Sequence, residues 1–295
     1  MQDTEIPREI SQESGTRSLF FSHGTTSQEK NKFPICDTYN FIPPVAITSQ
    51  TYLSLRTAMY HSVWRTVFTL FEHWDNQKRE TWATPETDED VEDAVGLRMD
   101  VLGYGCTDHQ CARLANAPGM DVHAFTLHER PIPECKRDHS YVEAGMGDPN
   151  GDIPSRWCHG CDQLNEFLAG LDLLVITLPL TSLTRGMIAR EQFQTLGKRN
   201  SFVGNVGRGP IVNTDDLVDA LNNGTIRGAA VDVTDPEPLS AGHPLWEAKN
   251  VIITPHVGGN STQYSKRVLK VLARNLKNIA EGKELINKVN KSLSY

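Results

Sequence analysis

The sequence lacks the features that would place it in a membrane or on a nucleic acid. No apolar run approaches the roughly 18–20 residues needed to span a bilayer, and the most apolar stretch, Leu173–Thr184, is short and interrupted by Pro179. Basic residues are also in the minority, with 29 Lys and Arg against 37 Asp and Glu. Binding to a phosphate backbone needs a basic surface. A transmembrane protein is therefore excluded, and neither a membrane nor a nucleic acid is expected as a partner.

Cysteine is sparse as well, with 6 residues in a chain of 295. That number is ordinary usage and does not form a disulfide framework. The one local pattern is Cys158–Cys161 (CHGC), for which Cys135 and His139 are conceivable partners. A structural zinc site needs four ligands, and no second CxxC or HxxxH follows, so no metal is expected. Because the N-terminus also has no apolar signal core, we expect a cytoplasmic protein with reduced thiols.

What the chain does contain is enough apolar sequence to bury a core, at 38% hydrophobic and 22% charged residues. Residues 1–18 are polar and patternless, so a disordered tail is expected there. Residues 19–94 start with short loop-like stretches. They continue with apolar residues at three- and four-residue steps over Tyr52–Trp74, which predicts a long amphipathic helix.

From residue 95 to residue 260, strand-like and helix-like stretches alternate. Strands are expected over Val95–Leu102, Val122–Thr126, Leu173–Leu178, Ser201–Val206, Ala229–Val233 and Val251–Thr254. Helices are expected over His109–Asn116, Gln163–Ala169, Arg190–Leu196 and Thr214–Asn222, the last capped by Thr214-Asp215-Asp216, with a final helix capped by Ser261 and running to about Glu281. The connection Leu127–Trp157 is long enough to be a loop insertion. Repeated strand–helix units predict an α/β fold with a doubly wound parallel sheet.

A glycine-containing loop follows the first expected strand and opens a helix. Its residues are Gly103, Tyr104, Gly105, Cys106, Thr107 and Asp108. In a dinucleotide-binding fingerprint the first glycine allows a tight turn, and the second lets the backbone approach a pyrophosphate at the helix N-terminus. The third position should be Gly or Ala but is Asp108. A plain strand-to-helix turn, with an acid favoured by the helix dipole, therefore stays open as an alternative.

The choice of cofactor depends on the end of the second strand. An acid about 20 residues after the loop usually binds the ribose 2′-hydroxyl of NAD, and none is found there. The strand ends instead at Thr126, and Arg130 follows closely. A non-acidic strand end with a nearby arginine favours a 2′-phosphate, and hence NADP over NAD.

Four motifs then follow in series. They are Leu178–Gly186 (LPLTSLTRG), Asn205–Val212 (NVGRGPIV), Ala230–Leu239 (AVDVTDPEPL) and Thr254–Gly259 (TPHVGG). From roughly residue 95 to residue 281, the chain resembles the NAD(P)-binding domain of the D-isomer-specific 2-hydroxyacid dehydrogenases. This family includes glyoxylate/hydroxypyruvate and phosphoglycerate dehydrogenases. The insertion, with Gly147-Asp148-Pro149 and Trp157, resembles a branch known mainly from fungi.

The resemblance places the family's catalytic arginine, glutamate and histidine on Arg208, Glu237 and His256. The chemistry agrees, because reduction of a 2-keto acid needs a cation for the carboxylate and a proton for the carbonyl oxygen. A glutamate beside the histidine would favour the imidazolium, which keeps a general acid available near neutral pH. By the same resemblance the cofactor cleft is lined by Leu178, Pro179, Thr184, Val206, Asp232 and Gly258, with Asp232 at the nicotinamide amide.

The family's substrate domain, which is flavodoxin-like, is expected to be incomplete. Only 102 residues precede Gly103, and the segment Ser22, His23 and Gly24 resembles the loop that holds the substrate carboxylate. Residues 19–94 are thus interpreted as a remnant of this domain plus a linking helix at a homodimer interface. Residues 261–295 are interpreted as a C-terminal helix and tail that return to it.

Asp108 is the second departure from the family pattern. A carboxylate about 7 Å from a phosphate charge costs about 2 kcal/mol at an effective dielectric of about 20, less after screening. Cofactor binding would weaken by about one to two orders of magnitude. We expect an NAD(P)-dependent oxidoreductase that reduces small 2-keto acids such as glyoxylate or hydroxypyruvate. The alternative is a catalytically impaired NAD(P)-binding or interaction protein of the same superfamily.

Overall fold

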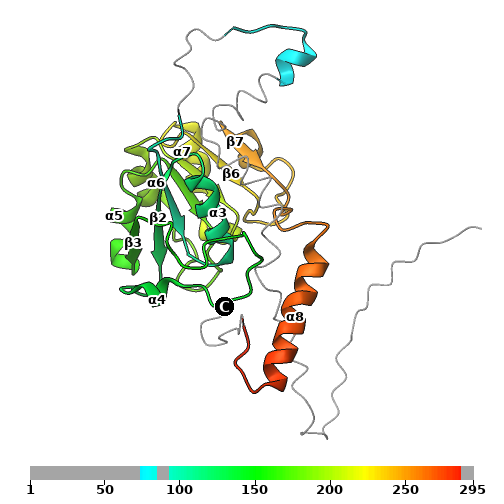
Figure 1. The fold of residues 1–295 in the computed structure, drawn as a ribbon. Helices are drawn as coiled ribbons and strands as arrows, with labels where there is room; N and C mark the ends of the chain where they lie inside the picture. The colour runs from blue at the N-terminus through cyan, green and yellow to red at the C-terminus, as the bar shows by residue number, and fades with distance from the viewer. Residues whose placement is uncertain (1–73, 85–92, 287–295) are drawn as a thin grey trace, which may run out of the picture. The chain divides into compact units, whose positions relative to one another are not determined.

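The structure is a computed structural model that describes residues 74–84 and 93–286. At its centre is one seven-stranded parallel sheet with the strand order β3-β2-β1-β4-β5-β6-β7 (Figure 1). The strands are β1 (Arg98–Leu102), β2 (Asp121–Thr126), β3 (Arg156–His159), β4 (Leu173–Ile176), β5 (Phe202–Asn205), β6 (Gly228–Val231) and β7 (Val251–Ile253). The α-helices are α3 (Cys106–Asn116), α4 (Pro133–Lys136), α5 (Leu164–Leu168), α6 (Arg190–Gly197), α7 (Thr214–Asn222) and α8 (Tyr264–Ala280). The predicted parallel α/β sheet is confirmed.

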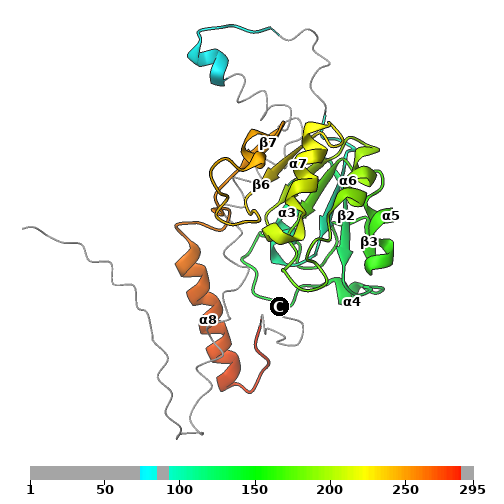
Figure 2. The ribbon, with the colours of Figure 1, turned by 180° about the vertical axis from the view of Figure 1, so that it is seen from behind.

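Helices cover both faces of the sheet, as the two opposite views show (Figures 1 and 2). On one face, Cys111, Ala112 and Ala115 of α3 pack against Met99 and Val101 of β1. On the other face, α5, α6 and α7 line up beside one another and enclose a larger apolar cluster. Side chains of a strand point alternately to its two faces, so each strand supplies both clusters.

Strand β4 shows why a nearly all-apolar run was a reliable signal. Leu173 and Val175 belong to the cluster under α3, whereas Leu174 and Ile176 belong to the cluster on the opposite face. All four side chains are fully buried. A strand in the middle of a parallel sheet has no solvent face, which requires apolar residues at every position.

The prediction that Leu127–Trp157 is entirely loop was wrong at two places. The helix α4 forms inside it, and β3 begins at Arg156 and extends the sheet beyond β2, with Arg156 opposite His123. Strand β3 is only four residues long (RWCH) and carries charged or polar side chains at both ends. It lies at the edge of the sheet, where solvent reaches one side, so no apolar run marks it in the sequence.

The start of one helix and the capping residue of another differ from the prediction. Helix α3 begins at Cys106 rather than at His109, so it rises directly from the glycine loop. Helix α7 is capped by Asn213, whose side chain accepts a hydrogen bond from the backbone N–H of Asp216 at 3.0 Å, and Thr214 is the first helical residue. Asparagine is as good an N-cap as the Ser, Thr and Asp residues that sequence patterns usually single out.

Two other elements, α8 and β1, begin later in the sequence than predicted. Helix α8 starts at Tyr264 rather than after Ser261, whose hydroxyl accepts a hydrogen bond from the Gln263 N–H ahead of the helix. Strand β1 starts at Arg98, because Val95 is 66% exposed and belongs to the preceding turn. Element ends depend on such local contacts and are the least certain part of a sequence reading.

Some predictions fall on parts of the chain that the structure does not describe. Residues 1–18, most of residues 19–94, including nearly all of the predicted helix Tyr52–Trp74, and the end of the C-terminal segment lie outside the described ranges. The proposed domain limits therefore stay predictions. Among the described residues, no helix has the length and apolar character needed to cross a membrane.

Candidate active site

The three predicted catalytic residues come from loops that follow three adjacent strands. Arg208 follows β5, Glu237 follows β6 and His256 follows β7. Because these strands are parallel neighbours, their carboxyl ends meet at one edge of the sheet, where ligands of doubly wound folds bind. The structure therefore places all three on the same edge of the molecule.

Glu237 and His256 form a direct pair. The Nδ1 atom of His256 lies 2.6 Å from Oε1 of Glu237. Both side chains are exposed by almost half, so a small molecule can reach the ring. With Nδ1 facing the carboxylate, the second ring nitrogen, Nε2, is the atom left for a reacting partner.

The backbone of His256 is in a conformation that side chains rarely adopt, with φ at +52°. Such a residue persists only when its surroundings hold it. Here the buried Asp232 stabilises the turn. Its carboxylate accepts hydrogen bonds from Thr254 Oγ1 at 2.5 Å, Val257 N at 3.0 Å and Gly258 N at 2.8 Å. Asp232 thus fixes the turn that carries the histidine, a role that the sequence reading missed. Its predicted contact with a nicotinamide amide stays a prediction.

Arg208 stands on a tight turn and its side chain is exposed. The next residue, Gly209, lies so close to the backbone of Thr234 that a β-carbon there would overlap the Thr234 carbonyl. Only glycine fits this approach of two loops. The turn therefore cannot move toward the β6 loop, and the guanidinium is presented outward, where it can bind a carboxylate through two N–H groups.

The glycine loop has the backbone that a dinucleotide requires. Gly103 has φ at +115°, and Gly105 is the N-cap of the 11-residue helix α3. Cys106 and Thr107 are the first residues of that helix, so their N–H groups lie at its positive end, which suits a pyrophosphate. The turn and the helix start therefore fit the pyrophosphate of an NAD(P) cofactor. The N–H groups of Cys106 and Thr107 would hold it, because Gly103 N donates to Phe125 O and Gly105 N donates to Asp108.

Asp108 does not point into solvent. Its carboxylate is 4% exposed, accepts a hydrogen bond from Gly105 N at 2.8 Å and is bonded by the hydroxyl of Thr177. Burial raises the pKa of this carboxyl from 3.8 to about 6, although the bonds to Thr177 and Gly105 oppose the shift. At neutral pH a buried negative charge therefore sits at the first turn of α3, inside the loop.

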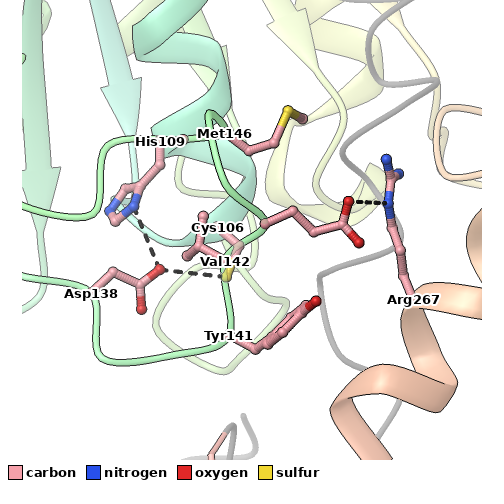
Figure 3. Close-up of a pocket in the computed structure, with 9 residues that line it drawn as sticks. Cys106, His109, Asp138, Tyr141, Val142, Met146 and Arg267 are labelled. Atoms are coloured by element: carbon pink, nitrogen blue, oxygen red, sulfur yellow. Dashed lines mark hydrogen bonds and ion pairs between the residues drawn. The ribbon is translucent and has the colours of Figure 1, made fainter.

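The long β2–β3 connection, residues 127–155, is anchored on α3. The hydroxyl of Tyr104 donates to Asp148 at 2.7 Å. The carboxylate of Asp138 lies between the buried His109 ring and the Cys106 thiol, where it borders a cavity of about 30 Å³ (Figure 3). Burial, together with the charge of Asp138, raises the pKa of Cys106 to about 11, so this thiol is not a reactive thiolate. These long-range contacts were not anticipated.

A larger cavity, of about 330 Å³, lies beside β3 and the loop after β2. Its lining includes the side chains of Arg130, Arg156 and His159 and the carboxylates of Glu129 and Glu166, of which Glu166 pairs with Arg156 at 2.6 Å. Arg130 stacks on the ring of Trp157 at 5.3 Å. Thr126, at the end of β2, is buried and uses its hydroxyl on a neighbouring backbone carbonyl. Arg130, which is predicted to select the cofactor, therefore borders an open polar cavity. The hydroxyl of Thr126 instead forms a hydrogen bond within the protein.

The remaining predicted cleft residues are spread along the same edge. Leu178 and Pro179 follow β4, Val206 follows β5, and Gly258 follows β7. Thr184 is buried and its hydroxyl donates to Pro179 O at 2.7 Å, so it stabilises the β4 loop. The predicted substrate loop, Ser22, His23 and Gly24, lies outside the described residues.

Comparison with known proteins agrees with this geometry. Residues 151–258 match the family model of the D-isomer specific 2-hydroxyacid dehydrogenase, NAD binding domain. A hydroxypyruvate reductase of Blautia hydrogenotrophica is 32% identical over 196 residues, which is 66% of this chain and 54% of that protein. A glyoxylate reductase of Aeropyrum pernix is 39% identical over 198 residues, 67% of this chain and 53% of that protein. The chain spans about half the length of the curated relatives it matches.

A solved structure extends the match to the fold. The D-isomer specific 2-hydroxyacid dehydrogenase of Xanthobacter autotrophicus, solved with NADPH and MES, superposes with a TM-score of 0.65 at 26% identity. The superposition covers 86% of this chain and 91% of that one. The sheet, the order of the motifs and these relatives together show that the chain carries the NAD-binding domain of the D-isomer-specific 2-hydroxyacid dehydrogenase family.

Proposed function

We propose that the protein is an NAD(P)-dependent oxidoreductase that reduces small 2-keto acids, such as glyoxylate or hydroxypyruvate, to 2-hydroxy acids. The observation that carries the proposal is the His256–Glu237 pair at 2.6 Å, on the same sheet edge as Arg208. The relatives named as hydroxypyruvate reductase and glyoxylate reductase support this substrate class.

The three residues divide the work of reduction between them. Arg208 binds the substrate carboxylate, and Nε2 of His256 gives its proton to the carbonyl oxygen as that oxygen becomes a hydroxyl. Glu237 accepts the Nδ1–H of His256, which keeps the ring oriented and stabilises its positive charge until the proton leaves. The hydride for the carbonyl carbon would come from NAD(P)H when that cofactor is bound. Since His256 is 46% exposed, solvent water can return the proton.

The direct test is the oxidation of NADPH or NADH, followed by absorbance, with glyoxylate or hydroxypyruvate as acceptor. We expect saturable turnover with one hydroxy acid formed for each reduced cofactor consumed. The buried charge of Asp108 at the phosphate loop favours the alternative of an impaired cofactor-binding protein. Saturable cofactor binding without turnover of either acid would support that alternative.

We further propose a preference for NADP, which rests on Arg130 and the cavity it borders. Arg130→Ala is expected to weaken NADPH binding by about ten- to a hundredfold, because hydrogen bonds to charged groups are worth about 1.5–3 kcal/mol. The affinity for NADH, which has no 2′-phosphate, should change little. Fluorescence titration with both cofactors measures the difference.

Arg137→Ala is the matched control for that titration. Arg137 lies in the same connection but is half-exposed, pairs with Glu134 and does not border the cavity. If Arg130→Ala weakened the binding of NADPH and of NADH equally, Arg130 would not bind the 2′-phosphate.

We also propose that the protein is a cytoplasmic homodimer. The predicted interface helix Tyr52–Trp74 is nearly all outside the described residues, but α8 carries an apolar stripe that solvent reaches. Its members are Leu269, Leu272, Leu276 and Ile279, each at least 42% exposed. A contiguous apolar face of this kind is typical of an interaction surface.

Sedimentation velocity at micromolar concentration should therefore give twice the 32.9-kDa chain mass. Leu276→Asp should shift the protein toward the monomer, because an interface centre excludes charge. Leu183→Asp, at a leucine of similar exposure away from α8, should leave the mass unchanged. A wild-type monomer at this concentration would contradict the dimer.

A further inference from the structure

Asn205 is a polar residue in an apolar place. It is the last residue of β5, in the middle of the sheet, and only 1% of its side chain is exposed. Its neighbours in register are Ile176 of β4 and Val231 of β6, both buried. Burying an amide costs free energy unless its donor and acceptor both form hydrogen bonds. The hydrogen-bond partners of this amide therefore indicate its role.

Both partners belong to the turn that carries Arg208. The side-chain oxygen of Asn205 accepts from Gly207 N at 3.1 Å, and the side-chain nitrogen donates to Arg208 O at 3.1 Å. One planar amide therefore holds two consecutive backbone units from the inside of the sheet. The turn needs both a donor and an acceptor, and the amide offers them on two atoms of one plane at any pH.

The Arg208 side chain depends on this backbone. Among the described residues, its guanidinium has one hydrogen bond, from Nη1 to Gly207 O at 2.6 Å. The direction of the guanidinium is thus set by the turn, and the turn is set by Asn205. The backbone carbonyl of Asn205 also accepts from Asp232 N at 3.0 Å, so the same residue ties the arginine turn to the strand end that holds the His256 turn.

We infer that Asn205 is a positioning residue for the substrate carboxylate, acting through Arg208. The inference rests on the proposed function, because it gives Arg208 the role of binding a carboxylate. Bidentate binding needs both N–H groups in a fixed plane, and a shift of about 1 Å in such a group can cost about a hundredfold in rate.

The test is Asn205→Asp, which keeps the shape and the acceptor for Gly207 N but loses the donor for Arg208 O. The Michaelis constant for glyoxylate should rise by about ten- to a hundredfold. NADPH affinity should change by less than about twofold. Below the pKa of the new buried carboxyl, its O–H can donate in place of the amide, so the Michaelis constant should return toward the wild-type value as the pH falls. Each value is compared with wild type at the same pH.

Asn278→Asp is the matched control. Asn278 is also buried, and its side-chain nitrogen donates to the backbone carbonyl of Glu284 at 2.8 Å, far along the chain from the site. The same loss of a buried donor should there lower stability without any change in the Michaelis constant. A purely structural role for Asn205 would make the two variants behave alike.

Calorimetry with oxalate, in the presence of NAD⁺, gives a readout that does not need turnover. If the wild type binds oxalate but reduces neither acid, the proposed function fails, whereas weaker oxalate binding by Asn205→Asp would still support the inference. An unchanged oxalate affinity and Michaelis constant in Asn205→Asp would overturn the inference. Absence of oxalate binding by the wild-type protein would overturn it too, because Arg208 would then not present itself to a carboxylate.

Discussion

Replacement of His256 by alanine is expected to lower kcat/KM for glyoxylate or hydroxypyruvate by about two to four orders of magnitude, the usual contribution of a general acid. Cofactor binding should stay within about twofold of wild type. The physical reason is that the ring lies at the sheet edge with Nδ1 on Glu237, so that Nε2 is the nitrogen that delivers the proton. Steady-state rates and cofactor titrations on the same preparation measure both quantities.

Two further variants sharpen this experiment. Glu237→Gln keeps the shape of the partner but removes its charge, so the rate should fall by about tenfold, less than for the loss of the ring itself. His139→Ala removes an exposed histidine of the β2–β3 connection and should have no effect. A His256→Ala protein that retains most of its activity would show that the proton comes from elsewhere.

Removal of the Asp108 charge is expected to tighten NAD⁺ binding by about tenfold at pH 8. In Asp108→Asn the side chain keeps an acceptor for Gly105 N, while the negative charge at the positive end of α3 disappears. A repulsion of about 1–2 kcal/mol at close range in a protein environment corresponds to about this factor. Isothermal titration calorimetry with NAD⁺ measures it, because NAD⁺ carries no 2′-phosphate that would itself titrate near pH 6.

The pH dependence gives this prediction its sign. The carboxyl has a pKa of about 6, so it is charged at pH 8 and largely neutral at pH 5. Wild-type affinity should therefore rise as the pH falls through 6, and the Asp108→Asn variant should lack this change. Asp215→Asn, which removes an acid from the first turn of α7, should follow wild type. Equal affinities of wild type and Asp108→Asn at pH 8 would mean that the buried charge does not act on the phosphates.

The raised pKa of Asp108 also makes the free energy of unfolding depend on pH. Since the native state holds the proton more tightly than the unfolded chain, with pKa values of about 6 and 3.8, the wild type gains from protonation at low pH. Its free energy of unfolding falls by up to about 3 kcal/mol as the pH rises from 4 to 7. Denaturant unfolding should show Asp108→Asn more stable than wild type at pH 8 and about equal to it at pH 4.

Much of this protein was determined by its sequence alone. The apolar run of β4 had to lie in the middle of a parallel sheet, because only a strand buried on both faces accepts apolar residues at every position. The glycine loop between a strand and a helix, and the arginine, glutamate and histidine motifs in family order, placed the reacting groups at the ends of successive strands. Since parallel strands end at one edge, the order of the motifs was sufficient to bring Arg208, Glu237 and His256 to the same side.

Only the tertiary structure decided what the polar groups between these motifs do. Asp108 was expected to face a phosphate, yet it turns inward onto Gly105 and Thr177. Asp232 holds the His256 turn, and the amide of Asn205 clamps the Arg208 turn. Helical and strand periodicity records which face of an element is apolar, but it does not record which distant donor a buried acceptor will meet. That choice is made when the strand ends come together, because a polar group buried there must find its partner among whatever backbone the fold brings within reach.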